Sequence, residues 1–156
     1  MEKLRIESNT NISKIVLRSV PDRAGIAAEI FGALATQGFN VELVVTSGGT
    51  KGTADICLAV SQDQQRDIHS TLDKIRDEVQ AKDVEADTAV ALVSITGPNL
   101  SKVPGVAGRL FNALSNKGIN IDVISTSLSS VTCMIAEEQT AAAVAALEGE
   151  FLEDRV

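Results

Sequence analysis

The sequence predicts an α+β protein made of two copies of one βαββαβ module. The first observation is an internal repeat, because residues 25–47 match residues 105–127 at nine of 23 positions after a shift of eighty. The second is that strand and helix patterns follow the same order in both halves of the chain. The third is that the second copy ends one strand early, while a short spare strand stands at the N-terminus. We therefore expect the N-terminal strand to complete the second module.

The first module, residues 14–88, is expected to adopt the ferredoxin-like order of strand, helix, strand, strand, helix, strand. Its first strand, residues 15–20, is apolar and ends at Pro21, and its first helix, residues 25–36, has apolar residues at helical spacing. Gly38 stands where a left-handed C-terminal cap is needed. The remaining expected elements are a strand at 41–46, a glycine-rich hairpin turn at 47–52, a strand at 53–60, a helix that resumes near Asp63 and includes Val79, and a strand at 84–86.

The second module, residues 89–156 plus residues 1–9, repeats this order up to its last helix. Its expected elements are a strand at 89–96, a longer loop at 97–104, a helix at 106–116, strands at 119–126 and 131–136, and an alanine-rich helix at 140–151. A sheet that stops there has an exposed edge, which is a liability for unwanted pairing. Residues 4–6 alternate apolar and charged side chains and supply the missing strand.

Composition limits the partners and the compartment. The formal charge of −7 argues against nucleic acid or an anionic membrane as the main partner, since both require a basic face. The first residues contain no apolar run of the signal-peptide kind. Cys57 and Cys133 are far apart in apolar runs, which favours free thiols in a reducing compartment. We expect a cytoplasmic protein.

The start of the first helix is the best candidate for a ligand site. Its first amides have no partner within the helix, and the positive end of the helix dipole attracts a carboxylate. Gly25 allows a close approach to the backbone, and Asp22 can hold an ammonium group. A free α-amino acid needs both kinds of partner. The alternative is that Asp22–Gly25 is only a turn and helix cap, which is a common use of such residues.

The sequence offers no set of residues suited to catalysis. His69 is the single histidine and is expected on the solvent side of its helix. No nucleophilic or metal-binding arrangement can be built from it and two remote cysteines. Residues 48–52 lack the spacing of a phosphate-binding loop, and Glu137 and Glu138 are most simply the acidic start of a helix. We expect no cofactor and no metal.

With the repeats in place, the sequence resembles the tandem ACT region of aspartokinase, the regulatory part of that enzyme. The resemblance covers nearly the whole chain and is carried by KIVLRSVPDRAGIAAEIFGALATQGFNVELVV, TADICLAV, VALVSITG and VPGVAGRLFNALSNKGINIDVISTS. The opening, MEKLRIESNTNISKIVL, resembles the start of separately translated regulatory β subunits. The resemblance implies two ACT modules and feedback sensing of lysine, threonine or both. It also implies that the kinase domain, which holds ATP and aspartate, is missing.

The resemblance implies which residues bind the effector. In the first module they are Asp22, Arg23, Ala24, Gly25, Ile26, Ala27, Asn40, Val41, Glu42 and Thr46; in the second they are Val106, Ala107, Asn120, Ile121 and Ser127. Three positions depart from the usual family residues. Thr46 replaces a common glutamine, Leu128 a common glutamate, and Ala24 a common proline.

Three functions remain open from the sequence. The leading hypothesis is an amino-acid-binding regulatory region of aspartate kinase that forms a homodimer and acts on the kinase catalytic domain or subunit. The second is a stand-alone tandem ACT sensor for another enzyme. The third is a structural dimerisation module with a vestigial ligand site. The sequence leaves the effector open between lysine and threonine, and the response open between inhibition and activation.

Overall fold

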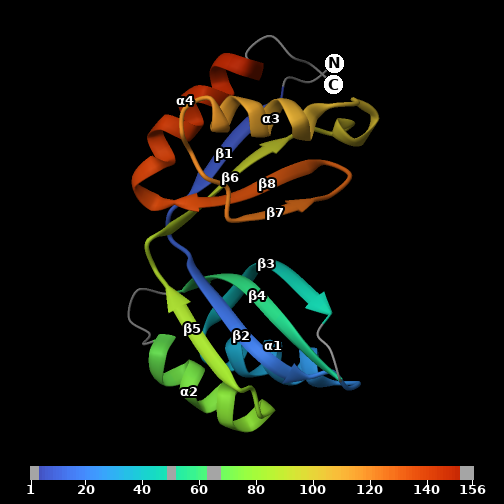
Figure 1. The fold of residues 1–156 in the computed structure, drawn as a ribbon, viewed down its shortest axis with the longest axis vertical. Helices are drawn as coiled ribbons and strands as arrows, with labels where there is room; N and C mark the ends of the chain where they lie inside the picture. Colours follow the sequence, from blue (N-terminus) through green and yellow to red (C-terminus); the bar gives the residue numbers. More distant parts are fainter. Residues whose placement is uncertain (1–3, 49–51, 63–67, 152–156) are drawn as a thin grey trace. The chain divides into compact units, whose positions relative to one another are not determined.

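The computed structural model describes residues 4–48, 52–62 and 68–151. The chain divides into two compact units. The continuous unit is residues 11–88, and the split unit combines residues 1–10 with residues 89–156. Both are drawn in Figure 1, coloured along the sequence. The two ends of the chain therefore belong to one unit, although the whole continuous unit separates them in sequence.

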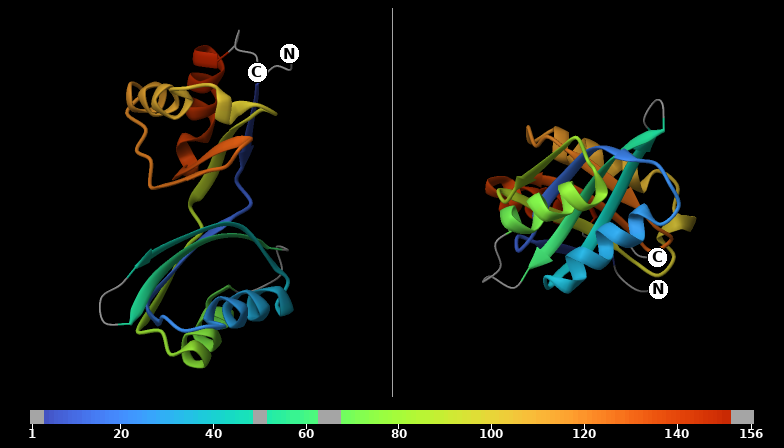
Figure 2. Two further views of the ribbon diagram at one scale, coloured as in Figure 1. Left: turned by 90° about the vertical axis from the view of Figure 1, so that its right-hand side faces the viewer. Right: turned by 90° about the horizontal axis from the view of Figure 1, so that it is seen from below.

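The continuous unit is one antiparallel sheet with two helices on one face (Figures 1 and 2). Its elements in chain order are β2 (Ser13–Pro21), α1 (Ile26–Thr36), β3 (Phe39–Gly48), β4 (Thr53–Gln62), α2 (Ile68–Val79) and β5 (Asp83–Asp87). The strand order in the sheet is β3-β4-β2-β5. This is the predicted βαββαβ arrangement, and the apolar faces of both helices are buried against the sheet.

The split unit has the same architecture, but its strands come from both ends of the sequence. Its elements are β1 (Arg5–Asn9), β6 (Val90–Thr96), the 3-10 turn η1 (Leu100–Lys102), α3 (Val106–Ser115), β7 (Val123–Thr126), β8 (Ser130–Ala136), the 3-10 turn η2 (Glu137–Gln139) and α4 (Thr140–Phe151). The strand order is β1-β6-β8-β7. Strand β1 runs antiparallel to β6, from Arg5 opposite Thr96 to Asn9 opposite Leu92. The prediction that the N-terminal strand completes the second module is confirmed.

The start of β7 differs most from the sequence prediction, which began this strand at residue 119. The structure begins it at Val123, because Ile119 closes helix α3 instead. The Ile119 N–H donates to the Leu114 carbonyl at 3.0 Å, just after Gly118 with a φ of 70°. A left-handed glycine followed by such a bond is a common helix stop. Residues 49–51 of the predicted turn at 47–52 and the predicted helix start near Asp63 lie outside the described residues.

Each unit has its own hydrophobic core between its sheet and its helices. Ile30 of α1 and Leu58 of β4 are fully buried in the continuous unit, as are Leu110 of α3 and Leu147 of α4 in the split unit. Burial of such aliphatic side chains is the main force that holds a sheet and its helices together. Among the described helices, none is both long and apolar enough to cross a membrane.

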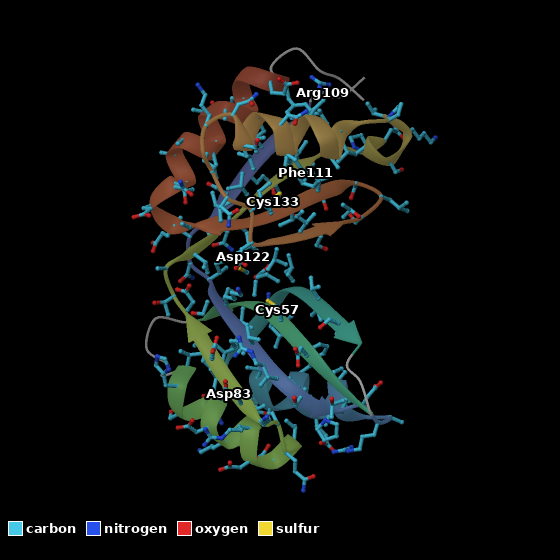
Figure 3. The ribbon with its side chains drawn as sticks, viewed as in Figure 1. Cys57, Asp83, Arg109, Phe111, Asp122 and Cys133 are labelled. Atoms are coloured by element: carbon cyan, nitrogen blue, oxygen red, sulfur yellow. The ribbon has the colours of Figure 1, made fainter. Side chains whose placement is uncertain are left out.

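Arg109 joins the two helices of the split unit (Figure 3). Its Nε donates to Glu150 Oε1 at 2.8 Å, and its Nη2 donates to the Glu150 carbonyl at 3.0 Å. The guanidinium carbon lies 4.5 Å from the centroid of the Phe151 ring. A planar guanidinium can stack on a ring and bind an oxygen at the same time. Arg109 on α3 therefore holds the end of α4 in place.

Leu4, the residue directly before β1, tests the role of the N-terminal segment, because its side chain is 7% exposed and packs in the core of the split unit. Leu4→Ala removes buried methyl groups and should lower the free energy of unfolding by about 2–4 kcal/mol. Denaturant unfolding measures the loss, and hydrogen exchange should locate it in β6 and β8. The exposed Glu7 within β1 is the matched control, and Glu7→Ala should change stability by less than about 0.5 kcal/mol. Faster exchange confined to β2 and β4 would contradict this role.

Cys133 on β8 gives the split unit a pH dependence (Figure 3). Burial raises the pKa of its thiol to about 12, whereas a free cysteine titrates near pH ~8.5. Above the lower value the unfolded chain loses a proton that the folded chain keeps, so stability falls as pH rises. Urea unfolding at pH 8 and pH 10 should show this loss, at roughly 1.4 kcal/mol per pH unit. Cys133→Ala should lack that part of the slope; equal slopes in both proteins would refute the assignment.

Candidate functional site

The turn between β2 and α1 leaves the start of the helix open. Strand β2 ends at Pro21 and α1 begins at Ile26, so four residues make the connection. Gly25 caps the helix with a φ of 87°, a left-handed conformation that glycine adopts without steric cost. No side chain bonds to the first turn as a cap. The Ile26 N–H donates to the Arg23 carbonyl at 3.3 Å and the Glu29 N–H to the Gly25 carbonyl at 3.0 Å, so the amides between them, of Ala27 and Ala28, are the ones that can bind a ligand.

A pocket of about 350 Å³ lies at this helix start. Its volume is within the range of roughly 300–1,000 Å³ that is usual for small-molecule sites. Six of the predicted effector residues line it: Asp22, Arg23, Gly25, Ile26, Ala27 and Thr46. The pocket brings the turn after β2 together with the end of β3, two segments that are distant in sequence.

The lining divides into an apolar floor and a polar rim. Val20, Ile26 and Ile56 are almost completely buried and form part of the floor. The exposed side chains of Asp22 and Arg23 stand at the rim. Such a lining suits a small molecule with an apolar part and a charged head group.

Arg23 is engaged within its own unit. Its Nη2 lies 2.8 Å from Glu29 Oε2, across the first turn of α1. This hydrogen bond and the charge of Glu29 raise the pKa of the Arg23 guanidinium, so it stays protonated. The pair also places a carboxylate in the first turn of the helix, where the dipole favours negative charge.

The predicted residues on the first half of β3 lie away from this pocket. Glu42 Oε1 accepts hydrogen bonds from Asn40 Nδ2 and from Ser61 Oγ, both at 2.9 Å. Val41 packs against the core of the unit. Glu42 and Thr46 are four positions apart on the strand, or about 13 Å at the usual rise. Asn40, Val41 and Glu42 are therefore not brought together with the turn within the continuous unit. Ala24 belongs to the turn but is not among the residues that line the pocket.

The predicted residues of the second module lie in the split unit. Val106 opens helix α3 and is buried, and Ala107 packs against the same core. Asn120 is exposed and Ile121 packs against the core, in the segment that leads into β7. Ser127 belongs to the turn between β7 and β8, where its hydroxyl lies 2.9 Å from that of Ser130. These five residues occupy a helix start, a strand entry and a hairpin turn.

Sequence reasoning missed half of the pocket lining. The missed residues are Val20, Pro21, Ser47, Gly48, Ala54 and Ile56. Ala54 and Ile56 are two positions apart on β4 and so face the same side of the sheet, which the alternation of that strand indicated. The sequence lacked the register of this pairing, which places Ala54 opposite Val20 and Thr53 opposite Pro21. Among the described residues, no three acidic, histidine or cysteine side chains gather in a way that can hold a metal ion.

Comparison with known proteins gives the family. Models described as ACT domain match residues 15–80 and residues 93–151, one in each unit. The aspartate kinase of Pseudomonas putida is 33% identical over 146 residues, a match that covers 94% of this chain and 36% of the relative. The chain thus spans about a third of the length of the curated relatives that it matches.

Solved structures of regulatory chains match over almost their full length. A chain in the crystal structure of aspartokinase alpha and beta subunits is 31% identical with a TM-score of 0.82, and the match covers 94% of this chain and 97% of that one. The ligand-free regulatory subunit of aspartate kinase from Thermus thermophilus is 27% identical with a TM-score of 0.82, over 94% and 96%. The chain therefore belongs to the ACT-domain family, as a tandem pair of the kind found in aspartokinase regulatory subunits.

Proposed function

We propose that this chain is the amino-acid-sensing regulatory part of an aspartate kinase and acts without catalytic groups of its own. The observation that carries the proposal is the pocket at the start of α1, which combines open helix amides with the carboxylate of Asp22. The likeness to aspartokinase regulatory subunits over almost their full length supports it. A partner kinase domain or subunit, in the cytoplasm, belongs to the same proposal.

The ligand chemistry follows from the two ends of the pocket. The α-carboxylate of the effector lies on the first amides of α1, where the donors and the helix dipole act together. Asp22 holds the ammonium group. Thr46, a predicted residue at the end of β3, faces the side chain of the effector with its hydroxyl and methyl groups.

Lysine and threonine are the proposed effectors. The structure of Escherichia coli aspartokinase III, which is 25% identical to this chain, was determined in complex with lysine and aspartate. The continuous unit has one acidic side chain at the pocket, Asp22, which matches the single ammonium of threonine. Lysine carries a second ammonium and needs a further acceptor from outside that lining.

The proposed site is completed by a neighbouring subunit. Asn120 and Ile121, with Val106, Ala107 and Ser127, come from the second module of another copy, and Asn40 to Glu42 contribute at the same boundary. A ligand that bridges two copies binds the assembled form better than the free form. It therefore shifts the population toward assembly by its difference in affinity, and a kinase whose activity differs between the two forms is controlled in this way.

Calorimetry of the whole 156-residue chain with each of the twenty amino acids tests the function. Binding of lysine or threonine, with little heat from the others, is the expected result. Binding of a different amino acid alone would point to a tandem ACT sensor for another enzyme. No binding by any of them would leave a structural dimerisation module and overturn the proposal.

Asp22→Ala tests the placement of the ligand. The change removes one charge-assisted contact, worth about 1.5–3 kcal/mol, so the affinity should fall roughly tenfold to a hundredfold. His69 is exposed on α2, and His69→Ala should leave the affinity unchanged. Titration calorimetry with the bound amino acid measures both variants. Equal affinities for the wild type and Asp22→Ala would show that the site lies elsewhere.

Self-association is the other consequence of a bridged site. Two edge strands, β3 and β7, carry exposed apolar side chains, Val44 at 38% and Ile124 at 42%. Edges of this kind suit pairing into a longer sheet across a two-fold axis. Sedimentation at micromolar concentration should show dimers that lysine or threonine makes more abundant. A monomer under all of these conditions would count against the bridged site.

A further inference from the structure

We infer that Asp55 on β4 is a positioning residue for the effector pocket, because its carboxylate holds the bulge in β2 that aims the following residues at the pocket. The inference rests on the proposed function for the identity of the ligand. Asp55 does not line the pocket and is not expected to touch the effector.

The bulge is visible in the pairing of β2 with β4. Leu17 lies opposite Ile56, and the next matched pair is Val20 opposite Ala54. Two residues of β2, Arg18 and Ser19, therefore face the single residue Asp55. An extra residue in one strand bends that strand and redirects the side chains that follow it.

Asp55 bonds to the strained residue of the bulge. Ser19 has a φ of 53°, a left-handed conformation that non-glycine residues rarely adopt. Its backbone N–H donates to Asp55 Oδ1 at 2.9 Å. Arg18 instead directs its side chain to β5, with its Nη1 2.7 Å from Glu85 Oε1. The carboxylate of Asp55 thus satisfies the backbone N–H of Ser19, which lies in the bulge.

The bulge decides which way the next residues face. A shift of one residue exchanges the two faces of a strand, so without it Val20 would turn away from the helices. With it, Val20 is 1% exposed in the core and lines the pocket. A second bond fixes the turn, since the Asp22 N–H donates to the Gly52 carbonyl at 2.8 Å. Residues 19–22 are therefore held by the bonds to Asp55 and Gly52 and by the pairing of Val20 and Pro21 with Ala54 and Thr53 of β4.

The split unit differs from the continuous unit at the strand that corresponds to β2, which is β6. Strand β6 pairs with β8 in unbroken register from Val90 to Thr96. Its loop to α3 is longer and bonds to the hairpin turn instead, through Gly97 N–H to Ser129 O at 2.9 Å and Ser101 N–H to Leu128 O at 3.1 Å. The hydrogen bond from the bulged Ser19 N–H to the Asp55 carboxylate therefore lies in the continuous unit, which also contains the pocket.

Four variants of the full chain separate positioning from simple loss of charge. Asp55→Ala removes the acceptor, and Asp55→Asn keeps an acceptor oxygen at the same place. Ser19→Gly combined with Asp55→Ala lets residue 19 adopt the left-handed conformation without the hydrogen bond to residue 55. The exposed Asp73 on α2 is the control, as Asp73→Ala removes the same charge outside the sheet. Calorimetry with lysine and with threonine gives the affinities.

We expect Asp55→Ala to weaken binding about tenfold, with Asp55→Asn and the double variant close to the wild type and Asp73→Ala unchanged. Wild-type affinity in Asp55→Ala, or no recovery in either rescue variant, would overturn the inference. Amide chemical shifts of residues 19–26 in the ligand-free protein give a second readout, in which Asp55→Ala should differ from the wild type and the double variant should revert. If the wild type binds neither amino acid, the proposed function fails, and these shifts alone decide the role of Asp55: unchanged shifts would overturn it.

Discussion

The pairing of β1 with β6 is the interaction on which the rest of the structure depends. Without β1, strand β6 would be an open edge, and the core of the split unit would lose Leu4. The pairing also means that the chain passes between the units twice, through three residues after β1 and two residues after β5. No single cut in the chain separates the two units. Truncation from either end therefore damages the split unit, whereas the continuous unit keeps all of its strands.

The repeat produces two helix starts of the same geometry but two different surroundings. Gly25 and Gly105 have φ values of 87° and 82°, and each carbonyl accepts from the fourth following N–H at 3.0 Å. The loops before them differ. Four residues precede α1, whereas the loop before α3 contains η1, whose Leu100 is buried in the core with Val106. A repeated sequence motif therefore repeats the backbone of a helix start, while the loop that leads into it differs between the two units.

Periodicity and the repeat predicted the order of the elements, and the missing edge predicted the place of β1. The turn at Asp22 and Gly25 was predictable because proline, aspartate and glycine each limit the backbone in a known way. The bulge at Ser19 was not, since serine has no preference for a left-handed conformation and its partner Asp55 lies 36 positions away. The distance of Glu42 from the pocket was also not predictable, because the resemblance to a family indicates which residues bind the effector and not how far apart they lie along β3.

On the proposed function, the chain can control a kinase only through a difference in effector affinity between two states of assembly. Contacts made within one continuous unit, such as those at Asp22, are present in both states and shift nothing by themselves. Each tenfold difference in effector affinity between the two states requires about 1.4 kcal/mol from contacts that exist in one state alone. A turn already bonded to Asp55 of β4 and to Gly52, the residue before β4, needs no ordering when the ligand arrives. On this proposal, the contacts across the subunit boundary determine the difference in effector affinity between the two states. The fixed turn determines the affinity that both states share.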